Sequence, residues 1–483
     1  MPSRSLAKDS LLSLVGLLSQ GLLRFTTSWL VGRLAGRAVL GTVQTAMSTA
    51  TLLALMGPTS VGSAASKYLA RARATEDRDE LLAVAAHLRR RAAVLAAVLA
   101  VVGVVFWVQY DDGTWVDALC VGLFTAAYSG YSFTRGVQFG TGQVRRATSW
   151  DVISGVVGVV ALLVALTAGA RGAVLLLPLV ISYTAYTLAA WPRVGSRHAP
   201  LSPSLRRELD EVIALGVAGT LASAGFLQIA MIVANGTGAE GAGQFAAAMA
   251  TATPASLLAV SLSLALFPSL AQAWARGDRD LFRDQTDRAA RVLMMIMVAV
   301  LGSLAICSAL VMRVLWGPGF DAESPILPTL LLAIMFTTVA VPCVNALVTR
   351  SRQHMRITTG ASFAGLCTGA LVWWALTPGM TAEGVAAGFL AGSVVSGSTP
   401  LLAEWRIGGH RWTWVVLRLP LAVALVLATI LALRVLDAPL WSEPFAALGF
   451  CAVWWGMCHR DVGLVPWASL RRMGARGGAD DPG

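Results

Sequence analysis

The stretch GRAVLGTVQTAMSTAT (residues 36–51) recurs in the chain as GAEGAGQFAAAMATAT (residues 238–253). Seven of the sixteen positions are identical, including Gly36, Gly41 and Met47. Two shorter matches follow in the same order, because DRD at 77–79 recurs at 278–280 and RAA at 91–93 recurs at 288–290. Chance matching in Ala-rich apolar sequence is the alternative, but three matches at a nearly constant spacing favour an internal duplication.

The composition is that of a membrane protein. Of the 483 residues, 56% are hydrophobic and 13% are charged, whereas soluble domains are about 25% charged. A helix crosses the hydrocarbon core with about 20 residues, and the apolar runs predict fourteen such spans. They are 11–32, 40–66, 91–109, 115–137, 147–168, 172–191, 210–234, 241–273, 288–312, 324–349, 355–376, 380–403, 412–433 and 440–458. The predicted fold class is therefore an all-α polytopic membrane protein.

The distribution of charge predicts the orientation. With the N-terminus in the cytoplasm, 30 of the 37 Lys and Arg fall in or next to cytoplasmic segments and five fall in outer loops. Because cytoplasmic loops of membrane proteins carry an excess of Lys and Arg, both termini are predicted to be cytoplasmic and the membrane is predicted to be the plasma membrane. The net charge of +11 then serves orientation and contact with anionic lipid headgroups, and we expect no nucleic-acid partner.

Each repeat holds six predicted spans, an even number, so the two copies enter the membrane from the same face and are related by an axis along the membrane normal. The sequence predicts a first six-helix lobe at 1–200, a second at 205–405, two additional transmembrane helices at 406–460, and a disordered cytoplasmic tail at 461–483. The connections 67–90 and 274–287 have the pattern of amphipathic surface helices. Cargo is expected in a central cavity between the lobes.

Signatures of enzymes, metals and cofactors are lacking in the sequence. The six cysteines have no CxxC spacing, and the five histidines have no ligand spacing. No phosphate-binding Gly-rich loop is found. We therefore expect a protein that is not an enzyme and that uses no cofactor or metal.

The first span contains the sharpest candidate for a binding residue, Arg24. An ionised side chain at this depth costs about 2.5–3.5 kcal/mol on insertion scales. Gln20, Arg24 and Thr27 share one helical face, which predicts that the face lines a hydrated interior. A guanidinium matches phosphate oxygens, so Arg24 is predicted to bind phosphate; the alternative is that it snorkels to the surface or has a structural role.

Three further spans contain weaker candidates. Tyr128, Tyr131 and Arg135 follow a helical spacing in the fourth span and could stack on sugars and meet a diphosphate; the alternative is an interfacial aromatic belt with an ordinary cytoplasmic Arg. Asp151, near Arg145 and Arg146 in the sequence, could couple transport to an ion; the alternative is that it complements a helix N-terminus and pairs with these local arginines.

The remaining candidates are uncharged. Gln228 in the seventh span could bind sugar, or else form a hydrogen bond between helices. Ser48 belongs to the hydroxyl-rich second span, which Pro58 is expected to interrupt. Pro254 and Pro268 are expected to interrupt the equivalent span of the second repeat. Breaks in repeat-related helices point to a binding site or a hinge.

At this point the chain resembles the polysaccharide-transporter (oligosaccharide flippase) family of the multidrug/oligosaccharidyl-lipid/polysaccharide (MOP) exporter superfamily. The resemblance covers about 10–405 and rests on five short segments. They are RLAG at 33–36 with Gly41, AEGAGQF at 239–245, LFPSL at 266–270, GPGF at 317–320 and GVAAG at 384–388. It implies movement of a polyprenyl-pyrophosphate-linked oligosaccharide from the inner to the outer leaflet. The acid that relatives often carry in the seventh span is absent here, where Ile229 and Ala230 stand.

The expected function is therefore a lipid-linked saccharide flippase that works by alternating access. Its partners would be the lipid-linked substrate, membrane lipids and other proteins of polysaccharide assembly. The alternatives are a cation-coupled drug exporter of the same superfamily, an integral-membrane glycosyltransferase or polymerase, and a non-transporting scaffold for envelope-assembly enzymes. Because Arg24 is accompanied by no acid in the first spans, cationic cargo is disfavoured, and the short outer loops disfavour the transferase.

Overall fold

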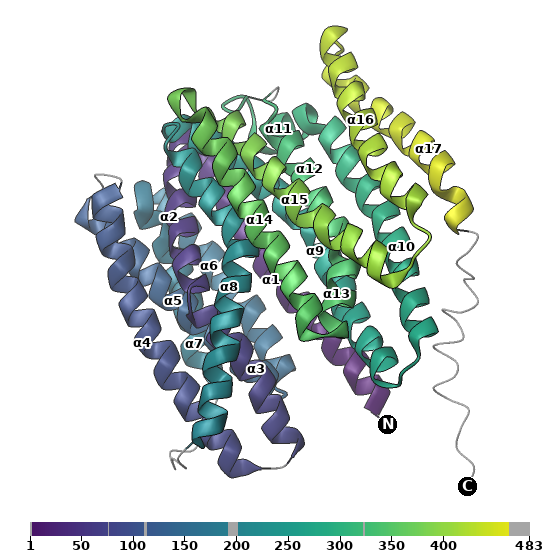
Figure 1. Ribbon diagram of the computed structural model, residues 1–483. Helices are drawn as coiled ribbons and strands as arrows, with labels where there is room; N and C mark the ends of the chain where they lie inside the picture. Colours follow the sequence, from purple (N-terminus) through teal and green to yellow (C-terminus); the bar gives the residue numbers. More distant parts are fainter. Residues whose placement is uncertain (1, 76, 111–113, 192–200, 322–323, 463–483) are drawn as a thin grey trace.

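The computed structural model describes residues 2–75, 77–110, 114–191, 201–321 and 324–462, and the described residues form helices and turns without a β-strand (Figure 1). The first half holds α1 (Pro2–Ala35), α2 (Arg37–Leu55), α3 (Pro58–Ala74), α4 (Arg78–Tyr110), α5 (Trp115–Gly140), α6 (Val144–Thr167), the 3₁₀ turn η1 (Gly172–Leu176) and α7 (Leu177–Ala190). The second half holds α8 (Pro203–Asn235), α9 (Ala239–Ala275), α10 (Arg279–Ile306), α11 (Ser308–Trp316), α12 (Ile326–Val339), α13 (Val341–Arg350), α14 (Arg352–Leu376), η2 (Thr377–Gly379) and α15 (Ala382–Gly408). α16 (Thr413–Val435), η3 (Leu440–Ser442) and α17 (Glu443–Val462) follow.

The predicted all-α polytopic fold is confirmed. Each of the fourteen predicted spans coincides with one helix or with two consecutive helices, such as α2 and α3 or α12 and α13. Within the described residues, ten helices are long and apolar enough to cross a membrane by length and composition alone. The predicted disordered tail at 461–483 lies almost entirely outside the described residues.

Two details of the predicted helices are wrong. The second span breaks at Met56 and Gly57, immediately before Pro58, but its repeat partner α9 runs without a break from Ala239 to Ala275. The connections 67–90 and 274–287 are not separate surface helices, because α3 and α4, like α9 and α10, extend beyond the predicted spans and meet at short turns. An amphipathic pattern does not distinguish a surface helix from the solvated end of a long transmembrane helix.

Repeat-related residues adopt the same local structure. Gly36 and Gly238 precede α2 and α9 with φ of 93° and 94°, a left-handed backbone region that favours glycine. Asp77 and Asp278 each accept a backbone N–H three residues later, at 2.8 and 2.9 Å. Both carboxylates therefore cap the helix that follows, α4 in the first half and α10 in the second.

The helices α2 and α9 cross at their first turns through two glycines at equivalent positions of the repeat. Gly41 lies against the carbonyl oxygen of Ala239, and Gly243 lies against the carbonyl oxygen of Arg37. A Cβ atom on either glycine would overlap the partner backbone. The same crossing carries an ion pair between Arg37 and Glu240. The contact is reciprocal, as expected when two similar units meet across a twofold axis.

The packing of helices against one another is also similar in the two halves. In the first half, α5 packs against α4, α3 and α7, and α6 packs against α1 and α7. In the second half, α12 packs against α10, α9 and α15, and α14 packs against α8 and α15. The last two helices, α16 and α17, pack against α10 at one side of the bundle, while α4 lies at the opposite side (Figure 1).

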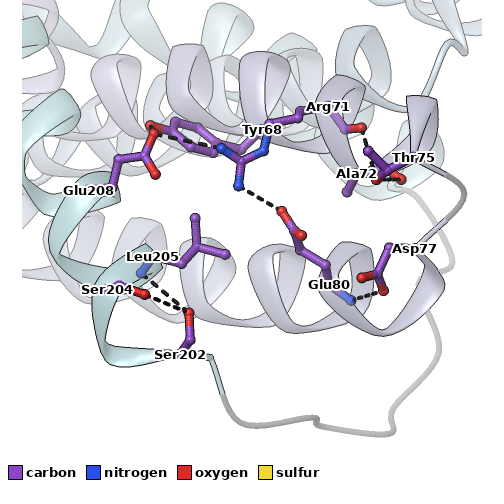
Figure 2. Close-up of polar contacts among 10 residues, drawn as sticks. All are labelled: Tyr68, Arg71, Ala72, Thr75, Asp77, Glu80, Ser202, Ser204, Leu205 and Glu208. Carbon is purple, nitrogen blue, oxygen red and sulfur yellow. Dashed lines mark hydrogen bonds and ion pairs between the residues drawn. The ribbon is translucent and has the colours of Figure 1, made fainter.

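α8 contacts both halves. Its first turns are tied to α3, where Glu208 accepts a hydrogen bond from Tyr68 at 2.8 Å and pairs with Arg71 at 3.7 Å (Figure 2). Arg71 also pairs with Glu80 of α4 at 2.9 Å. Farther along α8, the Phe226 ring lies 5.6 Å from the ring of Trp373 in α14. α8, which begins the predicted second repeat, is thus anchored to the first half at one end and to the second half at the other.

Candidate functional site

Arg24 lies on α1, which packs among α2, α6 and α9 and so passes between the two halves. Its Nε donates to the hydroxyl of Tyr183 at 3.4 Å, and its guanidinium carbon lies 4.8 Å from the centre of the Tyr128 ring. Its Nη2 is buried and has no hydrogen-bond partner among the described residues. Leaving a buried donor unsatisfied costs about 1–3 kcal/mol, so this nitrogen is suited to an acceptor brought by a ligand.

A layer of aromatic rings lies beside Arg24 and joins α5 to α7. The Tyr183 ring lies 5.3 Å from Tyr128 and 4.8 Å from Tyr131, and Tyr131 in turn lies 4.7 Å from Tyr186. Phe124 stacks on Tyr128 at 6.0 Å and lies 5.8 Å from Tyr183. These contacts fix the rings that support the guanidinium, because aromatic pairs at such distances attract each other beyond simple burial.

Asp151 of α6 is fully buried at the other end of this layer. Its carboxylate accepts a hydrogen bond from the Tyr131 hydroxyl at 2.9 Å and pairs with Arg135 Nε at 3.1 Å. The side chain of Gln20 donates to the backbone carbonyl of Asp151 at 3.2 Å. Gly16 of α1 passes so close that an added Cβ would lie 2.6 Å from the carboxylate.

The charges of this cluster do not cancel. Arg135 is neutralised by Asp151, whereas Arg24 forms no ion pair within the described residues. Since charges interact strongly in surroundings of low dielectric constant, the extra positive charge favours an anionic ligand. Within the described residues, no group of three or more His, Cys, Asp and Glu side chains could hold a metal ion.

The structure brings together Gln20, Arg24, Tyr128, Tyr131, Arg135 and Asp151. The other three predicted residues form no hydrogen bond with this cluster in the part of the chain that the structure describes. Thr27 is buried and donates to its own helix at Leu23, and Ser48 is fully buried on α2 without a hydrogen-bond partner in the described part. Gln228 is half-buried on α8 and has no hydrogen bond among the described residues.

Two of the alternative interpretations drawn from the sequence assign these residues the wrong interaction partners. Tyr131 and Arg135 do not form an interfacial belt, because Tyr131 is buried and both bind Asp151. Asp151 pairs with Arg135 of α5 and not with Arg145 or Arg146 of its own helix. On a helix these two arginines precede Asp151 by six and five residues, a spacing that directs them away from it.

Tyr183, Tyr186 and Gln138 also belong to this site but were not predicted from the sequence. Tyr186 donates to the side chain of Gln138 at 2.7 Å, and Gln138 donates to the carbonyl of Ala190. The spacing of Tyr183 and Tyr186 by three residues in an apolar span was the available signal, because two hydroxyls on one helical face need partners inside the bundle.

One family match covers part of the chain. Residues 143–325, less than half of the chain, match the family model described as "Lipid II flippase MurJ". The match includes α6 to α11, and therefore Asp151 and Tyr183, but not Arg24, Tyr128 or Arg135. No curated protein matches the chain in sequence.

Similar solved structures are found across most of the chain. The lipid II flippase MurJ in an inward closed conformation has a TM-score of 0.66 at 12% identity, and the match covers 94% of this chain and 99% of that one. A MATE family multidrug resistance transporter in an inward-facing conformation has a TM-score of 0.64 at 17% identity, covering 82% and 94%. A MOP superfamily transporter from Pyrococcus furiosus, whose binding pocket is described as having reverse polarity, has a TM-score of 0.60 at 15% identity, covering 84% and 96%.

At these identities the structures establish the fold. The chain has the fold of the MOP superfamily transporters, and the resemblance indicated by its sequence is confirmed at that level. The family model and the solved structures that match are those of flippases and transporters, and the helices of this chain are those of a multi-pass membrane protein.

Proposed function

We propose that this chain is a flippase that moves a polyprenyl-pyrophosphate-linked oligosaccharide from the inner to the outer leaflet of the plasma membrane, for cell-surface polysaccharide biosynthesis. The observation that carries the proposal is the unpaired guanidinium of Arg24 inside the bundle. A buried cation without a carboxylate partner is costly, and a diphosphate would supply both the charge and the hydrogen-bond acceptors that it lacks.

The aromatic layer supports the same class of substrate. Tyr128 holds one face of the Arg24 guanidinium and Tyr183 holds its Nε, so Nη2 remains to meet a phosphate oxygen. We assign Arg135 to the diphosphate as a second contact, with Gln20, Thr27, Ser48, Tyr131 and Gln228 along the path of the sugar. Arg135 gives its Nε to Asp151 and can offer its Nη groups to phosphate; Asp151 becomes available for coupling to an ion when Arg135 turns away from it.

Alternating access between two lobes is the proposed mechanism. The reciprocal crossing of α2 and α9 and the repeated helix neighbours support lobes at about 1–200 and 205–405, followed by two additional helices at 406–460. In this proposal the crossing closes the outer end, and the lobes must separate there to release the cargo. The lipid tail would remain in the bilayer throughout.

The membrane potential can drive export without an ion site. With both termini in the cytoplasm, as the charge distribution predicts, a headgroup with two negative charges moves outward from a negative interior. Each charge then contributes about 2.3 kcal/mol per 100 mV. A non-enzymatic flippase that is driven by the membrane potential requires no nucleotide.

A cation-coupled drug exporter is the second candidate, and the MATE structures support it through the fold. The charge of the site argues against it, because Arg24 would repel a cationic drug and the buried Asp151 is already paired. A non-transporting scaffold is distinguished from both candidates by a transport assay.

The decisive experiment is flipping of a fluorescent polyprenyl-diphosphate saccharide by the purified protein in vesicles with an imposed voltage. We expect Arg24→Ala to abolish flipping and Arg24→Lys to restore part of it. The exposed Arg171 in the turn before η1 gives a matched control, and Arg171→Ala should flip at the wild-type rate.

Three outcomes would count against the proposal. Flipping that survives Arg24→Ala would remove the assigned diphosphate contact. Flipping that ignores the voltage would exclude the potential as driving force. Export of cationic dyes in place of the lipid would favour the drug exporter.

A further inference from the structure

A second buried cluster of charged and titratable groups lies at the end of α15, away from the Arg24 site. We call it the Glu404 cluster, and it comprises Arg350, Glu404, His410 and Trp412. Glu404 lies one turn before the end of α15, Arg350 is the last residue of α13, and the other two follow a left-handed turn at Gly409 with φ of 62°. The side chain of Glu404 is 0% exposed, that of His410 is 2% exposed and that of Arg350 is 12% exposed.

The carboxylate of Glu404 is satisfied at only one of its two oxygens. Its Oε1 accepts from Arg350 Nη2 and lies 3.2 Å from His410 Nε2. Its Oε2 is buried and has no hydrogen-bond partner among the described residues. Buried carboxylate oxygens are normally hydrogen-bonded, so the unpartnered Oε2 leaves a position on this carboxylate for one further hydrogen.

The ring of His410 lies flat on the indole of Trp412, with ring centres 4.2 Å apart and 9° between the planes. Trp412 donates its indole N–H to Asp287 of α10. An aromatic face attracts a cation placed over it, so the imidazole is held between a carboxylate and a π face.

Other charged and titratable groups approach the cluster from the packed helices. Arg283, Asp287 and Arg291 belong to α10. Arg283 lies near Gly409, and Arg291 pairs with Asp287 and donates to the carbonyl of Arg411. On α13 the buried thiol of Cys343 lies within the electrostatic influence of Glu404. Glu404 and Arg350 neutralise each other. The Glu404 cluster is therefore uncharged overall when His410 is neutral, and it carries one positive charge when His410 binds a proton.

We propose that His410 and Glu404 form a proton-binding site, in which Arg350 is the fixed counter-ion of Glu404. Histidine is the side chain that changes charge near neutral pH. When the proton is bound, the contact between imidazole and carboxylate becomes a charge-assisted hydrogen bond, which is shorter and stronger than a neutral one.

The site sits in the turn that leads into α16. His410 and Trp412 connect α15 to α16, and the same turn reaches α10 through Asp287. The bound proton therefore fastens the start of the last two helices to α13 and α15. This inference does not depend on the proposed transport function.

The test is nuclear magnetic resonance of the purified full chain with isotope-labelled histidine. The chain has five histidines, and H410Q identifies the signal of His410 by its loss. We expect the chemical shift of His410 to change, as the pH is lowered, from that of a neutral imidazole to that of a protonated one. In E404Q the midpoint of this transition falls, because the carboxylate that stabilises the cation is gone, while the exposed His459 is unmoved.

Hydrogen–deuterium exchange provides a second measurement in case E404Q does not fold. At acidic pH we expect residues 409–420 to exchange faster in H410Q than in the wild type, whereas at alkaline pH the two proteins should exchange alike. H459Q is the matched control and should behave like the wild type at both. A His410 signal that does not titrate, an unchanged midpoint in folded E404Q, or exchange that is equal at acidic pH would each overturn the proposal.

Discussion

Replacing Asp151 with Asn tests whether the buried ion pair supports the whole aromatic layer. The change removes the charge that neutralises Arg135 and leaves only one oxygen for the two donors at 2.9 and 3.1 Å. Hydrogen bonds to a charged group contribute about 1.5–3 kcal/mol each, and breaking a buried pair by removing one partner costs about 3–5 kcal/mol. Because Asn retains one acceptor, we expect a loss at the lower end, about 3 kcal/mol.

The assay is unfolding of the purified protein in detergent, compared within one set of variants. The double variant Asp151→Asn with Arg135→Gln should recover most of the loss, because no charge is then left buried without a partner. Asp284→Asn is the matched control, since its pair with Arg288 is exposed on α10, and exposed helical pairs contribute about 0.3–0.5 kcal/mol. Equal stability of Asp151→Asn and Asp284→Asn, or a double variant no better than the single one, would refute the reasoning.

Three further predictions follow from the contacts of α1, α2 and α9. Tyr183→Phe removes the hydroxyl that accepts from Arg24 and should raise the substrate concentration needed for half-maximal flipping about two- to tenfold, matching about 0.5–1.5 kcal/mol per hydrogen bond. A disulfide between cysteines at Arg37 and Glu240 should stop flipping by holding α2 and α9 together, and a reductant should restore it. Gly16→Ala places a Cβ 2.6 Å from a buried carboxylate and should lower stability in detergent by about 1–3 kcal/mol, as overpacking does.

Each of these predictions has a control within the chain. Tyr68→Phe removes a tyrosine hydroxyl far from the site and should leave the substrate dependence unchanged. Cysteines at Arg71 and Glu80 join α3 to α4 within one half, so oxidation there should not stop flipping. Gly360→Ala meets nothing within 4 Å and should not destabilise the protein. Equal behaviour of any variant and its control would contradict the corresponding prediction.

The helices and several candidate residues could be predicted because their signals are local. A membrane span is an uninterrupted apolar run of sufficient length, and the repeated sequence at 36–51 and 238–253 anticipates the equivalent glycines at Gly36 and Gly238. Arg24 stands out because a charged residue inside an apolar span is energetically costly and usually has a function. The break of the second span at Gly57 was visible through Pro58.

The partners of these residues required the tertiary structure. Asp151 lies near two arginines in sequence and pairs with a third on another helix, and the tyrosine that supports Arg24 follows it by 159 residues. The sequence by itself determined which segments are helices and that they cross a membrane, since hydrophobicity and helical periodicity act over short stretches of chain. Only the packing of α1, α5, α6 and α7 decided which charges are neutralised and that Arg24 is left without a counter-ion, because hydrogen bonds and ion pairs depend on distances between helices.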